Sequence, residues 1–243
     1  ASVSPRLAAL PSTPARGQLI AGATRLQAVI AAKGAHEDVA RIAHGLAADL
    51  LKAYPVPLAP SKAPDLARGA SLFAQNCASC HGMTGDGHGP DAAKLKTPPI
   101  AFSEITRARQ RSPFALYQVI DQGIDGTAMQ SFATLPTDDR WALAFYAGRF
   151  AFSDAAANQG ERLWKSDPGL RQMIPDLTTL AGLTPEVLAK SIGPAKADAV
   201  IAYLRRHPDV VIQQAPGSLT VARDKLAQSL AAYRVGDRHA AQE

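Results

Sequence analysis

The chain has 243 residues, of which 47% are hydrophobic and 6% aromatic, and its formal net charge is +5. This length allows one or two domains with an ample core. The basic residues are spread out and are not interleaved with aromatic side chains, which argues against nucleic-acid binding. No apolar run approaches the roughly 18 to 20 residues of a membrane-spanning helix. Because β-branched residues are scattered rather than alternating, we expect an all-α protein.

Two helices are predicted near the start of the chain, after an irregular lead-in over residues 1–12. Thr13 and Pro14 supply an N-cap and a proline at the first helical position, so the first helix should begin there. The second covers residues 37–54, with apolar residues at helical spacing. We expect the pair to fold back as an antiparallel hairpin.

A proline-rich segment follows the hairpin, with proline at four of the ten positions 55–64. Proline at this density excludes a helix and indicates an extended, semi-rigid connector. The composition changes again after Phe152. We therefore divide the chain into three regions, at residues 1–60, 61–152 and 153–243.

The central region contains three predicted helices, at residues 64–76, 112–123 and 137–149. Ser112 and Pro113 form the N-terminal signal of the second helix, and Gly123 ends it. A glycine at position 69 lets the third helix approach the first closely. Phe73, on the same face, can then contact Trp141 or Tyr146.

The chain's two cysteines lie between these helices, in Cys77-Ala78-Ser79-Cys80-His81. Two cysteines separated by two residues and followed by histidine form the arrangement used for c-type haem attachment. The two thiols can form thioethers with the vinyl groups of a haem, and His81 can bind the iron as the proximal ligand. We therefore predict one covalently attached haem c, held by Cys77, Cys80 and His81.

Three other roles for the cysteine pair are a structural zinc half-site, a thioredoxin-like redox pair and a disulfide. Zinc needs a second ligand pair, and the remaining histidines do not form one. A thioredoxin-like pair belongs in a βαβ pattern, and no strand-like alternation lies nearby. Haem attachment is therefore the preferred interpretation.

The iron's sixth ligand has four candidates, listed in chain order as Met83, His88, Met129 and Met173. Met83 lies too near His81 to reach the opposite face of the haem, and Met173 lies beyond the helix that should close the domain. Met129 lies in a glycine-rich loop between two predicted helices and is the preferred ligand. His88 is the second choice, although an exposed loop position suits it better.

Two further features surround the predicted haem site. A proline carbonyl in the glycine-rich loop that ends at Pro90 is predicted to accept the Nδ1 proton of His81 and fix the ring. Three basic residues, Arg107, Arg109 and Arg111, lie beside the haem region. They are either solvated, in contact with the haem propionates, or available to attract an acidic redox partner.

The third region is predicted to contain further helices, including segments at residues 154–166 and 194–206. They repeat a helix, loop, helix order without a haem motif, so the region is a candidate degenerate second copy of the haem-domain arrangement. A last helix, from about residue 218, carries a narrow apolar stripe that by default packs within the chain.

Residues 64–152 resemble a class I cytochrome c domain through the cysteine–histidine motif, Met129 and the helix that carries Trp141. A longer resemblance is to the extracytoplasmic cytochrome region found in front of some bacterial oxidase-dependent iron permeases. It is carried by residues 53–60, 64–69, 123–129 and 139–146. In that family a membrane permease with E-x-x-E motifs follows, so a permease module is expected in the full-length protein.

The resemblance implies a periplasmic electron carrier that accepts electrons released when ferrous iron is oxidised, with ferrous iron or a redox protein as its partner. A carrier is preferred over a catalyst, because a haem with histidine and methionine ligands has no open position for a substrate. The alternatives are an electron-transfer subunit of a dehydrogenase or reductase complex, a sensor of diatomic ligands, and a helical docking scaffold.

Overall fold

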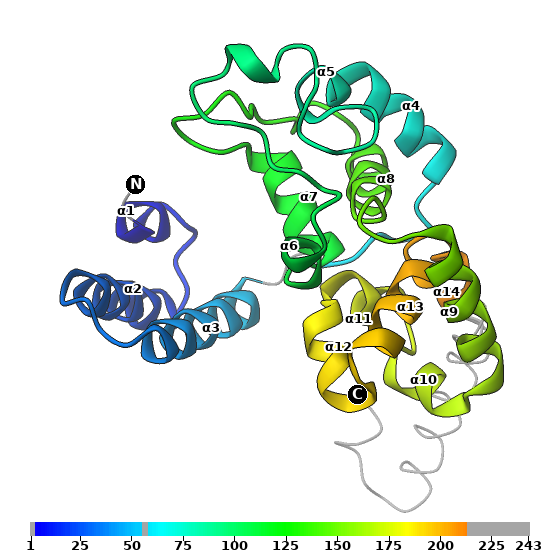
Figure 1. Cartoon of the computed structure of the whole chain (residues 1–243). Coiled ribbons are helices and arrows are strands. Elements are labelled where there is room, and N and C mark those ends of the chain that lie inside the picture. Colours follow the sequence, from blue (N-terminus) through cyan, green and yellow to red (C-terminus); the bar gives the residue numbers. More distant parts are fainter. Residues whose placement is uncertain (1–2, 55–57, 213–243) are drawn as a thin grey trace, which may run out of the picture. The chain divides into compact units, whose positions relative to one another are not determined.

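The computed structural model describes residues 3–54 and 58–212 (Figure 1). Throughout these residues the regular secondary structure is helical, without strands, and helices lie before and after the central region. The predicted all-α class is therefore confirmed. The chain divides into two compact units, Ala1–Pro57 and Leu58–Glu243. In the described part of the chain, no helix is long and apolar enough to cross a membrane.

The first unit contains α1 (Val3–Ala8), α2 (Arg16–Ala31) and α3 (His36–Ala53). Leu19 and Ala23 of α2 are buried, and Leu46 and Leu50 of α3 pack against them. These contacts join α2 and α3 as the predicted helical pair.

The start of this unit differs from the expectation. Residues 3–8 are helical rather than irregular, and the burial of Leu7 in the core of this unit accounts for the helix. Thr13 does not cap α2, which has no side-chain hydrogen bond at its N-terminus. The Thr13 hydroxyl instead donates to the Tyr54 hydroxyl at 3.2 Å, and α2 begins at Arg16, later than the Thr–Pro signal predicts.

The second unit opens with the helices of the central region. They are α4 (Leu66–Asn76), α5 (Ala78–His81), the 3₁₀ turn η1 (Ala92–Lys94), α6 (Ile105–Arg109), α7 (Pro113–Gln122) and α8 (Thr137–Ala147). The Ser112 side chain caps α7 by accepting from the Ala115 N–H at 3.2 Å. Gly123 ends α7 in a left-handed conformation with φ of 70°, as predicted.

Helices α4 and α8 cross at Gly69. A Cβ atom there would lie 2.5 Å from the Ala142 carbonyl oxygen and 3.0 Å from the Tyr146 Cβ, so only glycine allows this approach. One turn further along α4, the Phe73 ring lies 5.5 Å from that of Tyr146. The predicted close approach is confirmed, with Tyr146 in contact with Phe73.

Six more helices follow in the described part of the second unit, which ends at residue 212. They are α9 (Asp154–Ser166), α10 (Pro168–Met173), α11 (Leu177–Gly182), α12 (Pro185–Ile192), α13 (Pro194–Leu204) and α14 (Asp209–Ile212). The core that they form with the central helices is continuous, because Trp141 and Phe145 of α8 belong to the same buried cluster as Trp164 and Leu204. The three-part division proposed from the sequence stays a prediction, and the helix predicted from residue 218 lies outside the described residues.

The later helices repeat the arrangement of the central ones. Gly160 of α9 lies against the Ala199 carbonyl of α13, and a Cβ there would lie 2.9 Å from the Tyr203 Cβ, as Gly69 lies against Ala142 and Tyr146. α12 packs on α13 as α7 packs on α8. Thr184 and Pro185 begin α12 as the Ser–Pro pair begins α7. Helices α9, α12 and α13 thus form a second copy of the α4, α7 and α8 arrangement.

Candidate functional site

The two cysteines and the histidine project from one short turn. Cys77 ends α4, donating its N–H to the Phe73 carbonyl at 2.9 Å, and α5 starts at the next residue. The His81 N–H donates to the Cys77 carbonyl at 2.8 Å, which closes the turn. Cys77 and Cys80 are half-buried free thiols. Both thiols are thus available for thioethers, beside an imidazole that could ligate a metal.

His81 is held in a tautomer that could ligate a metal. Its Nδ1 lies 3.1 Å from the Ile100 carbonyl oxygen, and because a carbonyl only accepts, Nδ1 carries the proton. Nε2 therefore bears the lone pair that coordinates a metal. Burial lowers the pKa of His81, against a smaller opposite effect of the Ile100 hydrogen bond. The Phe102 ring, 4.6 Å away, packs on the imidazole.

The carbonyl that fixes His81 is not the one expected from the sequence. The prediction placed a proline carbonyl of the loop ending at Pro90 there, whereas the acceptor is Ile100. The loop instead packs against the cysteine turn, since the Asp91 N–H donates to the Ser79 carbonyl at 2.8 Å. A Cβ at Gly89 would lie 2.5 Å from the Ala78 carbonyl oxygen. The chain around Gly89 therefore covers the carbonyls of the turn, and a later segment supports the histidine.

The structure weakens the other interpretations of the cysteine pair. Burial, followed by the neighbouring Cys80 thiol, raises the pKa of Cys77 to about 11. A reactive redox thiol needs the opposite, a lowered pKa. In the described part of the chain, no three His, Cys, Asp or Glu side chains gather in a way that would hold a metal ion. The residues present therefore fit haem attachment better than zinc binding or thiol redox chemistry.

Met129 lies in a loop anchored to the end of α7. Its carbonyl accepts from the Ile124 N–H at 2.8 Å, and its own N–H donates to the Thr127 hydroxyl at 3.1 Å. The loop returns to α7 where the Phe132 N–H donates to the Ile120 carbonyl at 2.9 Å. The Met129 side chain is half-buried. Its assignment as an iron ligand stays a prediction.

The less favoured ligand candidates, including the second choice His88, are on the surface. Met83 is 63% exposed, and Met173 is exposed on α10. His88 is also exposed, with Nδ1 3.8 Å from a carboxylate oxygen of Asp86. Nothing in these surroundings favours one of them over Met129.

Aromatic side chains of α7 and α8 stack on one another. The Tyr117 ring stacks on Trp141 with centroids 4.2 Å apart, and Phe114 stacks on the same indole at 6.3 Å. Arg140 covers Tyr117 and pairs with Asp121. These contacts fix the helices that flank the Met129 loop.

The three arginines named from the sequence have different environments. Arg109 donates to the Asp198 carboxylate at 2.7 Å, and this ion pair joins α6 to α13. Arg107 lies 3.9 Å from a Glu104 oxygen at an exposed position. Arg111 is partly buried, and burial followed by the charge of Arg107 lowers its pKa. Of the three, Arg107 and Arg111 are close enough for the charge of one to affect the other.

Sequence reasoning missed Ile100, Phe102 and Arg205. Ile100 acts through its backbone carbonyl, for which no side chain gives a signal. Phe102 is one of several aromatic residues with no distinguishing spacing. Arg205 ends an apolar helix and resembles a solvated terminal charge, yet it is 1% exposed.

Comparison with known proteins identifies the central region. The family model described as cytochrome c oxidase, cbb3-type, subunit III matches residues 64–146, about a third of the chain. No curated protein and no solved structure matches. Residues 64–146 are therefore a cytochrome c domain, which implies covalently bound haem c and agrees with Cys77 and Cys80. Such domains are electron-transfer modules with redox protein partners and are typically extracytoplasmic.

Proposed function

We propose that this protein carries a single haem c, bound covalently by Cys77 and Cys80 and ligated by His81 and Met129, and that it transfers one electron at a time between redox partners. The observation that carries this proposal is the His81 imidazole, held with Nδ1 against the Ile100 carbonyl, which leaves the lone pair on Nε2, in the same turn as two free thiols. The haem supplies the one-electron change between ferric and ferrous iron.

The side chains of the site have separate tasks in this function. Cys77 and Cys80 fix the position of the macrocycle on the α5 turn. His81 supplies the nitrogen ligand, and its hydrogen bond to Ile100 fixes the orientation of the ring. Met129 supplies a thioether, and this ligand pair raises the reduction potential. If His81 and Met129 both ligate the iron, no ligand position remains for a substrate, and the site would favour electron transfer over substrate chemistry.

A reversible redox titration tests the proposal. The purified, matured protein should pass between two visible spectra in a single one-electron step, and the ferrous form should not bind carbon monoxide readily. A spectrum without haem bands, or rapid carbon monoxide binding, would contradict the proposed carrier.

We further propose that ferrous iron oxidation is the source of the electrons and that a membrane permease uses the ferric product. This narrower role is supported by the resemblance of residues 53–60, 64–69, 123–129 and 139–146 to the cytochrome region of iron permeases. It requires a periplasmic location. In stopped-flow mixing with ferrous iron, or with ferrous iron and the partner oxidase, the haem should become reduced.

A second candidate is a c-type subunit of a larger redox complex. The matched family model describes a subunit of an oxidase, and this observation favours the second candidate. Reduction by a quinol- or dehydrogenase-linked donor, together with no reaction with ferrous iron, would favour it over iron oxidation.

A further inference from the structure

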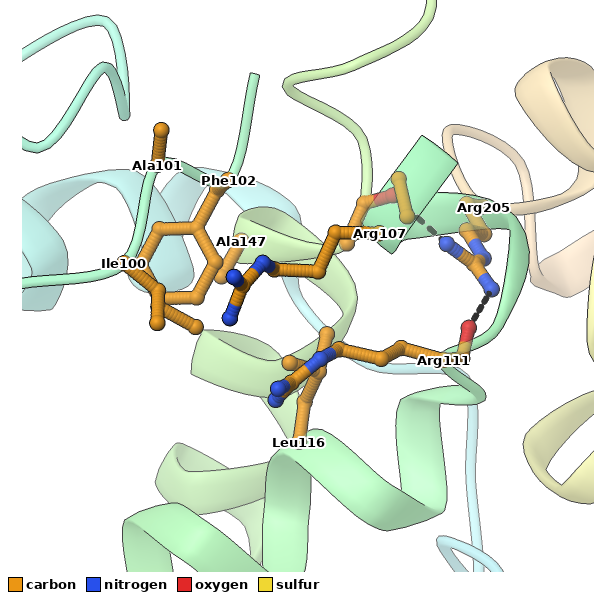
Figure 2. Close-up of a pocket in the computed structure, with 10 residues that line it drawn as sticks. Ile100, Ala101, Phe102, Arg107, Arg111, Leu116, Ala147 and Arg205 are labelled. Carbon is orange, nitrogen blue, oxygen red and sulfur yellow. Dashed lines mark hydrogen bonds between the residues drawn. The ribbon is translucent and has the colours of Figure 1, made fainter. Parts of the chain in front are cut away.

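A small pocket lies behind the segment that supports His81. Its lining includes Ile100, Phe102, Arg107, Arg111, Leu116 and Arg205 (Figure 2). Ile100 and Phe102 are the residues that bond to and pack on His81. The pocket and the imidazole therefore share Ile100 and Phe102 as neighbours.

The lining is rich in positive charge. It includes three arginines, and no Asp or Glu is among the described residues that form it. Figure 2 shows the Arg107 and Arg111 side chains lying side by side, with Arg205 bonded to the backbone of Arg111. An opposing anion would lower the electrostatic energy of this arrangement.

Arg205 is the buried member of the three. Its Nη1 donates to the Gly148 carbonyl at 2.8 Å, and its Nη2 donates to the Arg111 carbonyl at 2.5 Å. Its Nε has no partner among the described residues. Burial lowers the pKa of Arg205 to about 9, so the group still carries its charge at neutral pH. The guanidinium is held by neutral carbonyls rather than by a carboxylate.

The residue comes from outside the cytochrome c domain. It directly follows α13, in the second copy of the helix arrangement, whereas the matched domain ends at residue 146. Its two hydrogen bonds hold the chain between α6 and α7 and the chain just after α8. The C-terminal part of the second unit therefore places a charge in the pocket that Ile100 and Phe102 also line.

We propose that Arg205 is a positioning residue that also tunes the haem. It fixes the backbone of Arg111 and Gly148 around the pocket, and its buried positive charge favours the ferrous state over the ferric state. Ferric iron carries one more positive charge, so a cation in a poorly screened interior raises the reduction potential. This inference rests on the proposed function, because it requires a haem at His81.

The hydrogen bonds alone suggest a different role, in which Arg205 only joins the C-terminal helices to the domain. A merely structural role would change the stability of the protein and leave the potential of a correctly folded variant unchanged. The reduction potential therefore separates the two roles, and a charge-preserving variant gives a second test.

The experiment compares variants of the full chain, matured with haem. Arg205→Met removes the charge and keeps most of the volume, and Arg205→Lys keeps the charge. Arg206→Met is the matched control, because Arg206 is the neighbouring half-buried arginine, donates to the Phe152 carbonyl and Asp154, and is not part of the pocket.

In equilibrium redox titrations, Arg205→Met should lower the reduction equilibrium constant up to about tenfold, which is about 59 mV for a one-electron couple. The reduction equilibrium constants of Arg205→Lys and Arg206→Met should stay within about twofold of the parent value, a smaller difference than the one expected for Arg205→Met. The visible spectrum must show the parent axial ligands in each variant. If Arg205→Met does not fold, Arg205→Gln is used in its place. The glutamine side chain is neutral, and its amide can still donate hydrogen bonds.

An unchanged potential in a haem-loaded Arg205→Met or Arg205→Gln protein would overturn this inference and leave the electron-carrier function intact. An equal decrease in Arg206→Met would also overturn it, because the effect would not be specific to the pocket. A parent chain without haem would overturn the carrier function and this inference together.

Discussion

At the scale of single residues, the proposed chemistry depends on His81, the two thiols and Met129. His81 is fixed by a backbone carbonyl and an aromatic ring, and both thiols lie on its turn. Met129 is held by the backbone of its loop. The four residues therefore belong to two separately anchored segments, one before and one after α7.

Replacement of Met129 by alanine tests the sixth ligand. The haem should stay attached, because the cysteines and His81 are unchanged. The ferric protein should lose its methionine-to-iron charge-transfer band, the ferrous protein should bind carbon monoxide, and the reduction potential should fall. Met83→Ala is the control, because Met83 is 63% exposed. An unchanged spectrum in Met129→Ala would exclude Met129 as the ligand.

Residue identities were predictable only where chemistry imposes a motif. The spacing of Cys77, Cys80 and His81 indicates haem attachment without any structure. Ile100 and Arg205 had no such signal: one acts through a carbonyl, and the other is buried by helices that are distant in sequence. A linear pattern does not show which backbone oxygen reaches a ring or which charge becomes enclosed.

At the scale of helices, α4 and α8 are joined by close packing at Gly69. Gly69→Ala should destabilise the protein by about 1–3 kcal/mol, because its Cβ would meet the Ala142 carbonyl and the backbone would have to move. Gly160→Ala should behave in the same way in the α9–α13 pair. Urea unfolding of the haem-loaded protein measures both.

The control for these two variants is Gly182→Ala. Gly182 ends α11, and no atom lies within 4 Å of a Cβ placed there. Alanine should therefore be neutral or slightly stabilising at this position. Equal stability of Gly69→Ala and Gly182→Ala would show that the helix crossing tolerates a side chain.

An ion pair also joins α4 to α8 and makes their packing dependent on pH. The Arg68 guanidinium donates to both oxygens of Asp139, at 3.1 Å and 2.6 Å. The side-chain hydrogen bond from Arg68 lowers the pKa of Asp139 from its ordinary value of 3.8. The ion pair therefore contributes fully to the stability of the protein above about pH 3.8, the ordinary pKa of Asp139. This contribution is lost as the pH falls through the lowered pKa.

Asp139→Asn should therefore lower the stability at neutral pH by less than Gly69→Ala does, because the pair is close to solvent. Its unfolding midpoint should also depend less on pH in the acid range. Urea unfolding of parent and variant at neutral pH and below pH 3.8 measures both effects. Parallel pH profiles would show that Arg68 does not stabilise the carboxylate.

Helix ends were predictable where the capping residue has no other partner. Ser112 and Gly123 bound α7 as expected. Thr13 carried a similar signal, but its hydroxyl bonds to Tyr54, which lies far along the chain. A capping signal in the sequence therefore does not show that the side chain caps, because it can lie toward a distant segment instead.

At the scale of the whole molecule, the second unit combines a cytochrome c domain with a second copy of its main helices. α10 follows α9 as α5 follows α4, yet Pro168–Met173 contains no cysteine or histidine. The later copy thus lacks the groups needed to attach haem. A repeated helical order was visible in the sequence, but the matching crossings at Gly69 and Gly160 were not, because they depend on contacts between distant segments.

The central claim is that one haem is bound through Cys77 and Cys80. Intact-protein and peptide mass spectrometry of the full chain, matured in a host that attaches haem, tests it most directly. The account predicts the mass of one haem on the peptide containing residues 77–81, and no added mass in the double variant Cys77→Ala, Cys80→Ala. A parent chain without added mass, or haem that persists covalently in the double variant, would contradict it.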